Sequence, residues 1–175
     1  MRGRFTLLCI VAAALAVGWP AASSATAPNN ESNTYAFSLE ADNMSQDAAG
    51  DTLAVSGDGT FGVHAKSASG AGDYTFTGAD GTTFSGTWKV NGLVTYQPYG
   101  CGVLFGTPIP SDLCGGRLVL GVTATTPFGP QPAQLTVICL IGNPPPSSEE
   151  GINAVIPSVG SFNRQIVGDN VYVKS

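Results

Sequence analysis

The chain has 175 residues, of which 43% are hydrophobic and 11% are charged, with twelve acidic and seven basic side chains. This length suits one domain with its own hydrophobic core, and the acidic excess makes nucleic acid and anionic membranes unfavourable partners. One histidine and four cysteines lack the clustering of a zinc site or of a nucleophile paired with a base. We therefore expect no metal, no cofactor and no catalytic residue of those kinds.

Residues 1–25 have the pattern of a secretory signal peptide. Arg2 and Arg4 precede an apolar run from Phe5 to Val17, and small residues follow. Because this run is too short to cross a bilayer, we expect cleavage after Ala25 rather than a membrane anchor. Cleavage removes two of the seven basic side chains and leaves five against twelve acidic ones, a formal charge of −7. The mature chain is predicted to have no transmembrane segment and to be secreted, either extracellular or in the cell envelope.

The rest of the chain is predicted to be all-β. Residues 26–33 are expected to form a flexible lead-in, and residues 34–175 a single antiparallel domain. Helical periodicity is absent, and glycine and proline recur about every ten residues, which favours a β-sandwich, with a β-barrel as the alternative. The predicted strands are 35–41, 52–64, 73–77, 82–89, 93–99, 117–125, 134–141, 152–156, 162–167 and 171–174, the last two joined by a tight hairpin.

An acidic loop follows the first predicted strand. It carries Asp42, Asn43, Asp47 and Asp51, and oxygen ligands of this kind suit calcium. Their spacing differs from the EF-hand pattern, so the sequence leaves calcium binding open. The only histidine, His64, ends the next strand on its polar face, and we expect it at the surface.

Residues 73–99 are predicted to form a three-stranded meander with two three-residue turns. The first turn, at 79–81, pairs Phe76 with Phe84. The second, at 90–92, pairs Trp88 with Val94. Both turns place aromatic side chains on one face and hydroxyl side chains on the other. The central Gly86 is then covered by aromatic rings from both neighbouring strands, Tyr74 and Tyr96.

Three cysteines remain after removal of the signal peptide. Cys139 lies within the apolar run 135–141, so we expect it to be a buried free thiol. Cys101 and Cys114 flank a loop of twelve residues that contains two prolines. They are the preferred disulfide of an exported chain, and a bridge between Cys114 and Cys139 is the main alternative.

Strands that simply alternate in direction would gather three connections at one end of the molecule: the turn at Asp80, the loop between Cys101 and Cys114, and the loop 142–151. Loops on a rigid scaffold commonly carry function, so this end is the predicted contact surface. Ordinary solvated loops are the competing interpretation. The candidate binding residues are Leu104, Phe105, Ile109, Asp112, Glu149 and Glu150.

Four short motifs give the chain a resemblance to other proteins: Tyr99-Gly-Cys-Gly102, Leu113-Cys-Gly-Gly116, Ile138-Cys-Leu-Ile-Gly-Asn-Pro-Pro145 and Glu149-Glu-Gly-Ile152. With these, the chain resembles a group of small secreted bacterial proteins of uncharacterised activity, over residues 50–175. The resemblance implies no activity, cofactor or catalytic residue.

Three hypotheses about function follow. The first is an exported non-catalytic β domain with a binding or structural role at or outside the cell envelope, whose ligand, a glycan or a protein, is unknown. The second is a glycan-acting enzyme in which Glu149 or Glu150 works with another carboxylate, since glycosidases use two acids across a cleft. The third is an assembly subunit that pairs through an exposed edge strand.

Overall fold

The computed structural model describes residues 33–40 and 43–175. The predicted signal peptide, nearly all of the lead-in, and Asp42 of the acidic loop lie outside these residues. The described part is all-β and contains no helix. Its large antiparallel sheet is consistent with the β-sandwich that the sequence predicts.

The bounds of the strands are β1 Thr34–Leu39, β2 Met44–Gln46, β3 Thr52–Gly62, β4 Ser67–Thr77, β5 Thr83–Cys101, β6 Val103–Leu104, β7 Thr107–Pro108, β8 Leu113–Thr126, β9 Gly129–Cys139, β10 Gly151–Ile156, β11 Gly160–Phe162, β12 Arg164–Val167 and β13 Asn170–Lys174. The longest strands are β3, β4, β5, β8 and β9.

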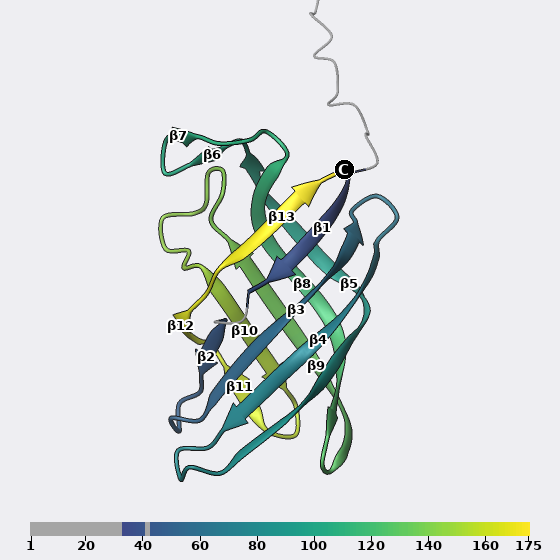
Figure 1. Cartoon of the computed structure of the whole chain (residues 1–175), viewed down its shortest axis with the longest axis vertical. Coiled ribbons are helices and arrows are strands. Elements are labelled where there is room, and N and C mark those ends of the chain that lie inside the picture. Colours follow the sequence, from purple (N-terminus) through teal and green to yellow (C-terminus); the bar gives the residue numbers. More distant parts are fainter. Residues whose placement is uncertain (1–32, 41–42) are drawn as a thin grey trace, which may run out of the picture.

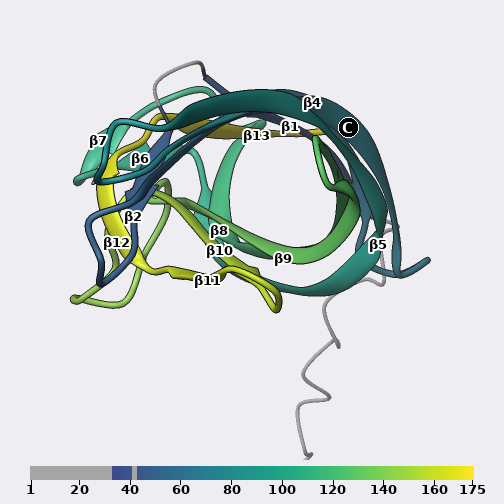
Figure 2. The same cartoon turned by 90° about the horizontal axis from the view of Figure 1, so that it is seen from below.

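Eleven of these strands form one sheet, in which β8 has three neighbours, β5, β9 and β13. From β13 the pairing continues through β1, β3 and β4 to β5. The sheet therefore curls so that its inner surface surrounds one hydrophobic core, as Figures 1 and 2 show. The small β6–β7 hairpin stands apart at the upper end in Figure 1.

The first predicted hairpin is confirmed in turn and register. Phe76 lies opposite Phe84, and Thr77 lies opposite Thr83. Gly81 has a φ of +85°, the left-handed conformation that closes a turn of this kind. The hydroxyls of Thr75 and Ser85 are hydrogen-bonded at 2.9 Å on the outer face, so the separation into an aromatic and a hydroxyl face is also correct.

The second predicted turn is wrong, and with it the third strand of the meander at 73–99. Strand β5 continues through Asn91 and Gly92, and its second half pairs with β8, which is distant in sequence. The β5–β8 register shifts within 90–92 and again within 93–95. Such irregularities act as β-bulges that redirect side chains, and Val94 is accordingly 56% exposed instead of facing inward.

Aromatic rings lie directly over strand glycines on the inner face. A Cβ added to Gly72 would clash with the indole of Trp88, and one added to Gly86 would meet the ring of Tyr74. The prediction that Tyr74 covers Gly86 is therefore confirmed, whereas Tyr96 covers a glycine of β8. The absence of a Cβ allows each ring to approach the backbone closely and to fill the core.

The predicted terminal hairpin at 167–171 is also wrong. β12 pairs with β2, whereas β13 pairs with β1 and β8. Residues Gly168 and Asp169 thus connect two strands that pair in different parts of the sheet and not with each other.

Candidate functional site

The predicted contact loops lie only in part at the same end. Gly142 donates its N–H to the Val103 carbonyl and Asn143 donates to Tyr99, each at 2.7 Å, so the loop 142–150 packs beside the disulfide loop. We call this region the disulfide end. The turn at Asp80 lies at the opposite end, because the uninterrupted β5 carries the chain across the whole molecule before Cys101.

Within the disulfide loop the predicted residues divide between core and solvent. Leu104 and Ile109 are partly buried against the hydrophobic core, so they attach the loop to the core. Phe105 is 79% exposed at the tip of the β6–β7 hairpin, and Asp112 and Glu149 are exposed. The structure thus leaves one apolar side chain and two separate carboxylates available at this surface.

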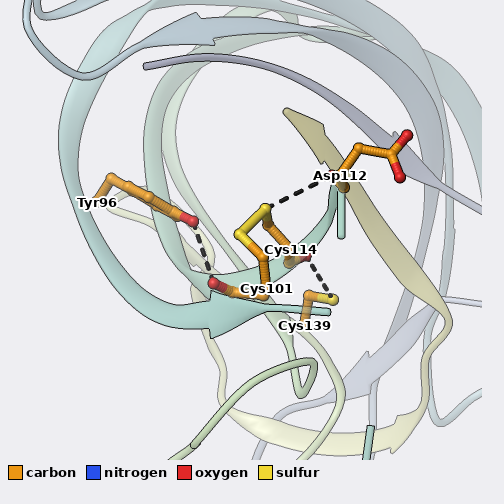
Figure 3. Close-up of a disulfide and its surroundings, with 6 residues drawn as sticks. Tyr96, Cys101, Asp112, Cys114 and Cys139 are labelled. Atoms are coloured by element: carbon orange, nitrogen blue, oxygen red, sulfur yellow. Dashed lines mark hydrogen bonds between the residues drawn. A yellow bond between two sulfur atoms is a disulfide. The ribbon is translucent and has the colours of Figure 1, made fainter. Parts of the chain in front are cut away.

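The predicted disulfide between Cys101 and Cys114 is present, and these two residues lie opposite each other in the β5–β8 pairing. Cys139 is the buried free thiol, as predicted, and Figure 3 shows it beneath the disulfide. Burial raises the pKa of the Cys139 thiol to about 12, which keeps it protonated and unreactive at neutral pH.

Glu150 is not a solvated loop residue. Its two carboxylate oxygens accept hydrogen bonds from the backbone N–H groups of Leu140, at 2.6 Å, and Asn170, at 3.1 Å. The side chain therefore joins the end of β9 to the start of β13. Burial, the larger cause, and the nearby charge of Asp169 raise the pKa of the Glu150 carboxyl to about 7.

At the other end of the molecule, carboxylates of the acidic loop accept hydrogen bonds from backbone N–H groups. One carboxylate oxygen of Asp47 accepts the N–H groups of Ala49 and Asp51, and Asp51 accepts from Ala79 of the neighbouring turn. These contacts stabilise turns. Among the described residues, which exclude Asp42, no group of three or more His, Cys, Asp and Glu side chains is placed to hold a metal ion. His64 is exposed, as predicted.

An apolar cavity lies at the end of the molecule opposite the disulfide, and we call this end the cavity end. Part of its wall is aromatic and comes from β4 and β5: Tyr74, Phe76, Phe84 and Trp88. The centre of a water-sized sphere can occupy about 70 Å³ within it, several times the roughly 10–15 Å³ that one water needs.

Three alanines explain why space remains there. Ala124, Ala133 and Ala154 belong to β8, β9 and β10, and all three line the cavity. Larger side chains at these inward positions would fill the core to the usual density. The sequence predicted the aromatic face but not the cavity, since the small residues come from strands whose partners were unknown. Alanine at inward positions of three separate strands is the signal that could have revealed it.

Exposed apolar side chains stand beside the cavity. Phe128, in the turn between β8 and β9, is 84% exposed and contacts Phe84 edge to face. Val159, in the turn between β10 and β11, is 55% exposed and lines the cavity itself. An apolar ligand entering here would bury surface that is otherwise in contact with water.

No carboxylate, histidine or cysteine occurs among the described residues that line the cavity. Tyr74 is its one ionisable side chain, and burial raises the pKa of that phenol. Glu149 and Glu150, which the sequence offered for glycan chemistry, do not line the cavity. The cavity therefore suits binding of an apolar molecule rather than acid–base chemistry.

No family model, curated protein or solved structure matches this chain. The resemblance to small secreted bacterial proteins thus stays a prediction. Nowhere in residues 33–40 and 43–175 is there a helix long and apolar enough to cross a membrane. The Cys101–Cys114 disulfide is compatible with an extracellular protein.

Proposed function

We propose that this chain is an exported, non-catalytic β domain that binds a small apolar molecule at or outside the cell envelope. The apolar cavity carries the proposal, because ligand sites are typically concave and mostly apolar with few polar groups. Side chains from six strands, β3, β4, β5, β8, β9 and β10, line this cavity, so the fold itself forms the site. Export is supported by the signal-peptide pattern of the sequence and by the disulfide.

The location of this site differs from the one expected from the sequence. The disulfide end is held together by backbone hydrogen bonds and by the Glu150 carboxylate, so its residues have a structural explanation. The cavity has no such structural explanation, because an unfilled apolar space lowers stability in proportion to its volume. Retention of such a space is explained if a ligand occupies it.

Trp88 provides a direct test, because its indole lines the cavity. The chain has two tryptophans, and since Trp19 lies in the predicted signal peptide, Trp88 is the only one in the mature protein. Titration with small aromatic and aliphatic hydrocarbons is expected to change its emission in a saturable manner. Ala133→Leu, which adds bulk to the cavity wall, should weaken that binding at least about tenfold, the effect of roughly 1.4 kcal/mol.

Val155→Leu is the matched control. Val155 neighbours the cavity-lining Ala154 on β10, is 44% exposed on the other face of the strand and does not line the cavity, so this variant should bind as the parent does. Absence of saturable binding in the parent, or equal loss in both variants, would contradict the proposal.

A further inference from the structure

Phe105 occupies the tip of the β6–β7 hairpin in an unfavourable backbone conformation. It has a φ of +49° and Gly106 has one of +82°, and these two residues connect the paired Leu104 and Thr107. Two-residue loops in which both φ angles are positive favour Asn followed by Gly, and a bulky side chain in this conformation is rare. The ring is nevertheless exposed. Packing within the chain therefore does not explain why Phe stands at this position.

The hairpin that carries Phe105 is tied to the rest of the molecule. The Cys101–Cys114 disulfide closes its base, and the Val103 carbonyl accepts a hydrogen bond from the N–H of Gly142 at 2.7 Å. Ordering a loop on association costs free energy, so a loop that is already fixed loses less when it binds. An aromatic side chain on such a hairpin is a favourable anchor for a binding partner.

The apolar cavity at the opposite end of the molecule is a matching site for such a ring. Its wall includes the rings of Phe76, Phe84 and Trp88, and aromatic rings pack well against each other. The Tyr74 hydroxyl and the Trp88 indole N–H donate to backbone carbonyls of the chain itself, both at 3.0 Å, so neither requires a polar ligand. The benzyl side chain of Phe has no hydrogen-bonding group that would be left unpaired there.

The charge and the size of this contact also suit a second copy of the chain. Residues 102–111 contain no charged side chain, so the acidic turns of the cavity end, with Asp47, Asp51 and Asp80, meet no like charge on the hairpin. One aromatic side chain buries about 150–250 Å², well below the roughly 1,200 Å² of a stable interface. The contact is therefore expected to be weak and to depend on protein concentration.

We propose that Phe105 of one molecule inserts into the apolar cavity of a second copy of this chain. Because the β6–β7 hairpin and the cavity lie at opposite ends of the molecule, as Figure 1 shows for the strands, the contact is head-to-tail and can extend into longer assemblies. The inference rests on the proposed function and adds a partner for the same cavity. A small apolar ligand and a second copy then compete, so the ligand controls assembly.

Sedimentation equilibrium of the mature protein between about 10 µM and about 1 mM tests the contact. The average mass of the parent should rise with concentration. Phe105→Asn should weaken the association at least about tenfold, the effect of burying a Phe side chain. This variant should be at least as stable in urea as the parent, because Asn suits the loop conformation better. Ile166→Thr, which removes an exposed apolar side chain from the edge strand β12, is the control and should associate as the parent does.

A mixture of two variants tests the direction of the contact. Phe105→Asn keeps the cavity and lacks the ring, whereas Ala133→Leu keeps the ring and has a filled cavity. Each should be monomeric alone, and an equal mixture should form dimers that do not grow further. Saturating toluene, which has the shape of the Phe side chain, should dissociate both the parent and the mixture.

Three outcomes would overturn the contact while leaving ligand binding intact: a parent that stays monomeric at the highest concentration, a mixture that does not associate, or assembly that persists when toluene is bound. A loss of association in Ile166→Thr equal to that in Phe105→Asn would also overturn it and would favour pairing through the edge strand. Toluene that leaves the emission of Trp88 unchanged would overturn the proposed function as well.

Discussion

Glu150 makes the stability of the fold depend on pH in an unusual direction. Its carboxyl has a pKa raised from 4.5 to about 7 in the folded protein, mainly by burial. The folded state therefore holds this proton more tightly than the unfolded state. By linkage, the resulting stabilisation is fully present below pH 4.5 and is lost as the pH rises towards 7.

The magnitude follows from the same two pKa values. Each pH unit between them corresponds to about 1.4 kcal/mol, which gives an upper limit of roughly 3 kcal/mol. Because the carboxyl keeps some contact with solvent, we reduce this to about 1–2 kcal/mol. Asp80 does not interfere, since hydrogen bonds from Thr82 lower the pKa of its carboxyl below 3.8, outside this range.

The assay is urea unfolding followed by circular dichroism at pH 5 and pH 8, with the disulfide intact. The parent should be more stable at pH 5, and Glu150→Gln should remove this difference. The variant should also be destabilised at pH 5, because its amide nitrogen cannot accept from one of the two backbone N–H groups that Glu150 holds. Glu149→Gln is the control and should keep the pH dependence. Equal stability of the parent at both pH values, or an unchanged difference in Glu150→Gln, would refute this reasoning.

Three other predictions concern the core. Tyr172→Phe should lower the free energy of unfolding by about 1 kcal/mol, measured in urea, because its fully buried hydroxyl donates to a β9 carbonyl at 2.9 Å; no change would mean that this bond is not needed. Gly72→Ala should cost at least about 1–3 kcal/mol, since its Cβ would meet the backbone carbonyl of Ser56 as well as the Trp88 ring, whereas Gly92→Ala has open space and should be nearly neutral. Cys139 should react with a thiol reagent only after unfolding, and rapid labelling of the native protein would contradict its burial.

Local sequence patterns predicted much of the fold. The alternation along residues 52–64 predicted β3, which ends at Gly62, with Leu53, Val55 and Phe61 buried in the structure. The Asp80 turn predicted the β4–β5 register, because the length of a hairpin loop determines which residues face each other. The turn predicted at Asn91-Gly92 is wrong although this pair has the composition of a turn. Pairing with β8 keeps β5 extended through it.

The candidate site was less accessible from sequence. The positions of Glu150 and of the cavity depend on which strands become neighbours, and hairpin signals do not specify pairings between distant segments. A turn at 90–92 would return the chain to the Asp80 end before Cys101, whereas the uninterrupted β5 carries it to the opposite end. The inward alanines of β8, β9 and β10 meet only when these strands pack around the core.

The sequence by itself determined the all-β class, the first hairpin, the choice of Cys101 and Cys114 as the disulfide, and the burial of Cys139, since each depends on residues close together in the chain or on the hydrophobicity of one segment. Only the tertiary structure decided that β5 crosses the molecule, that Glu150 is held by two backbone amides, and that small and aromatic side chains from five strands leave a cavity between them. Those features arise where distant segments pack together, and packing is a property of the assembled core.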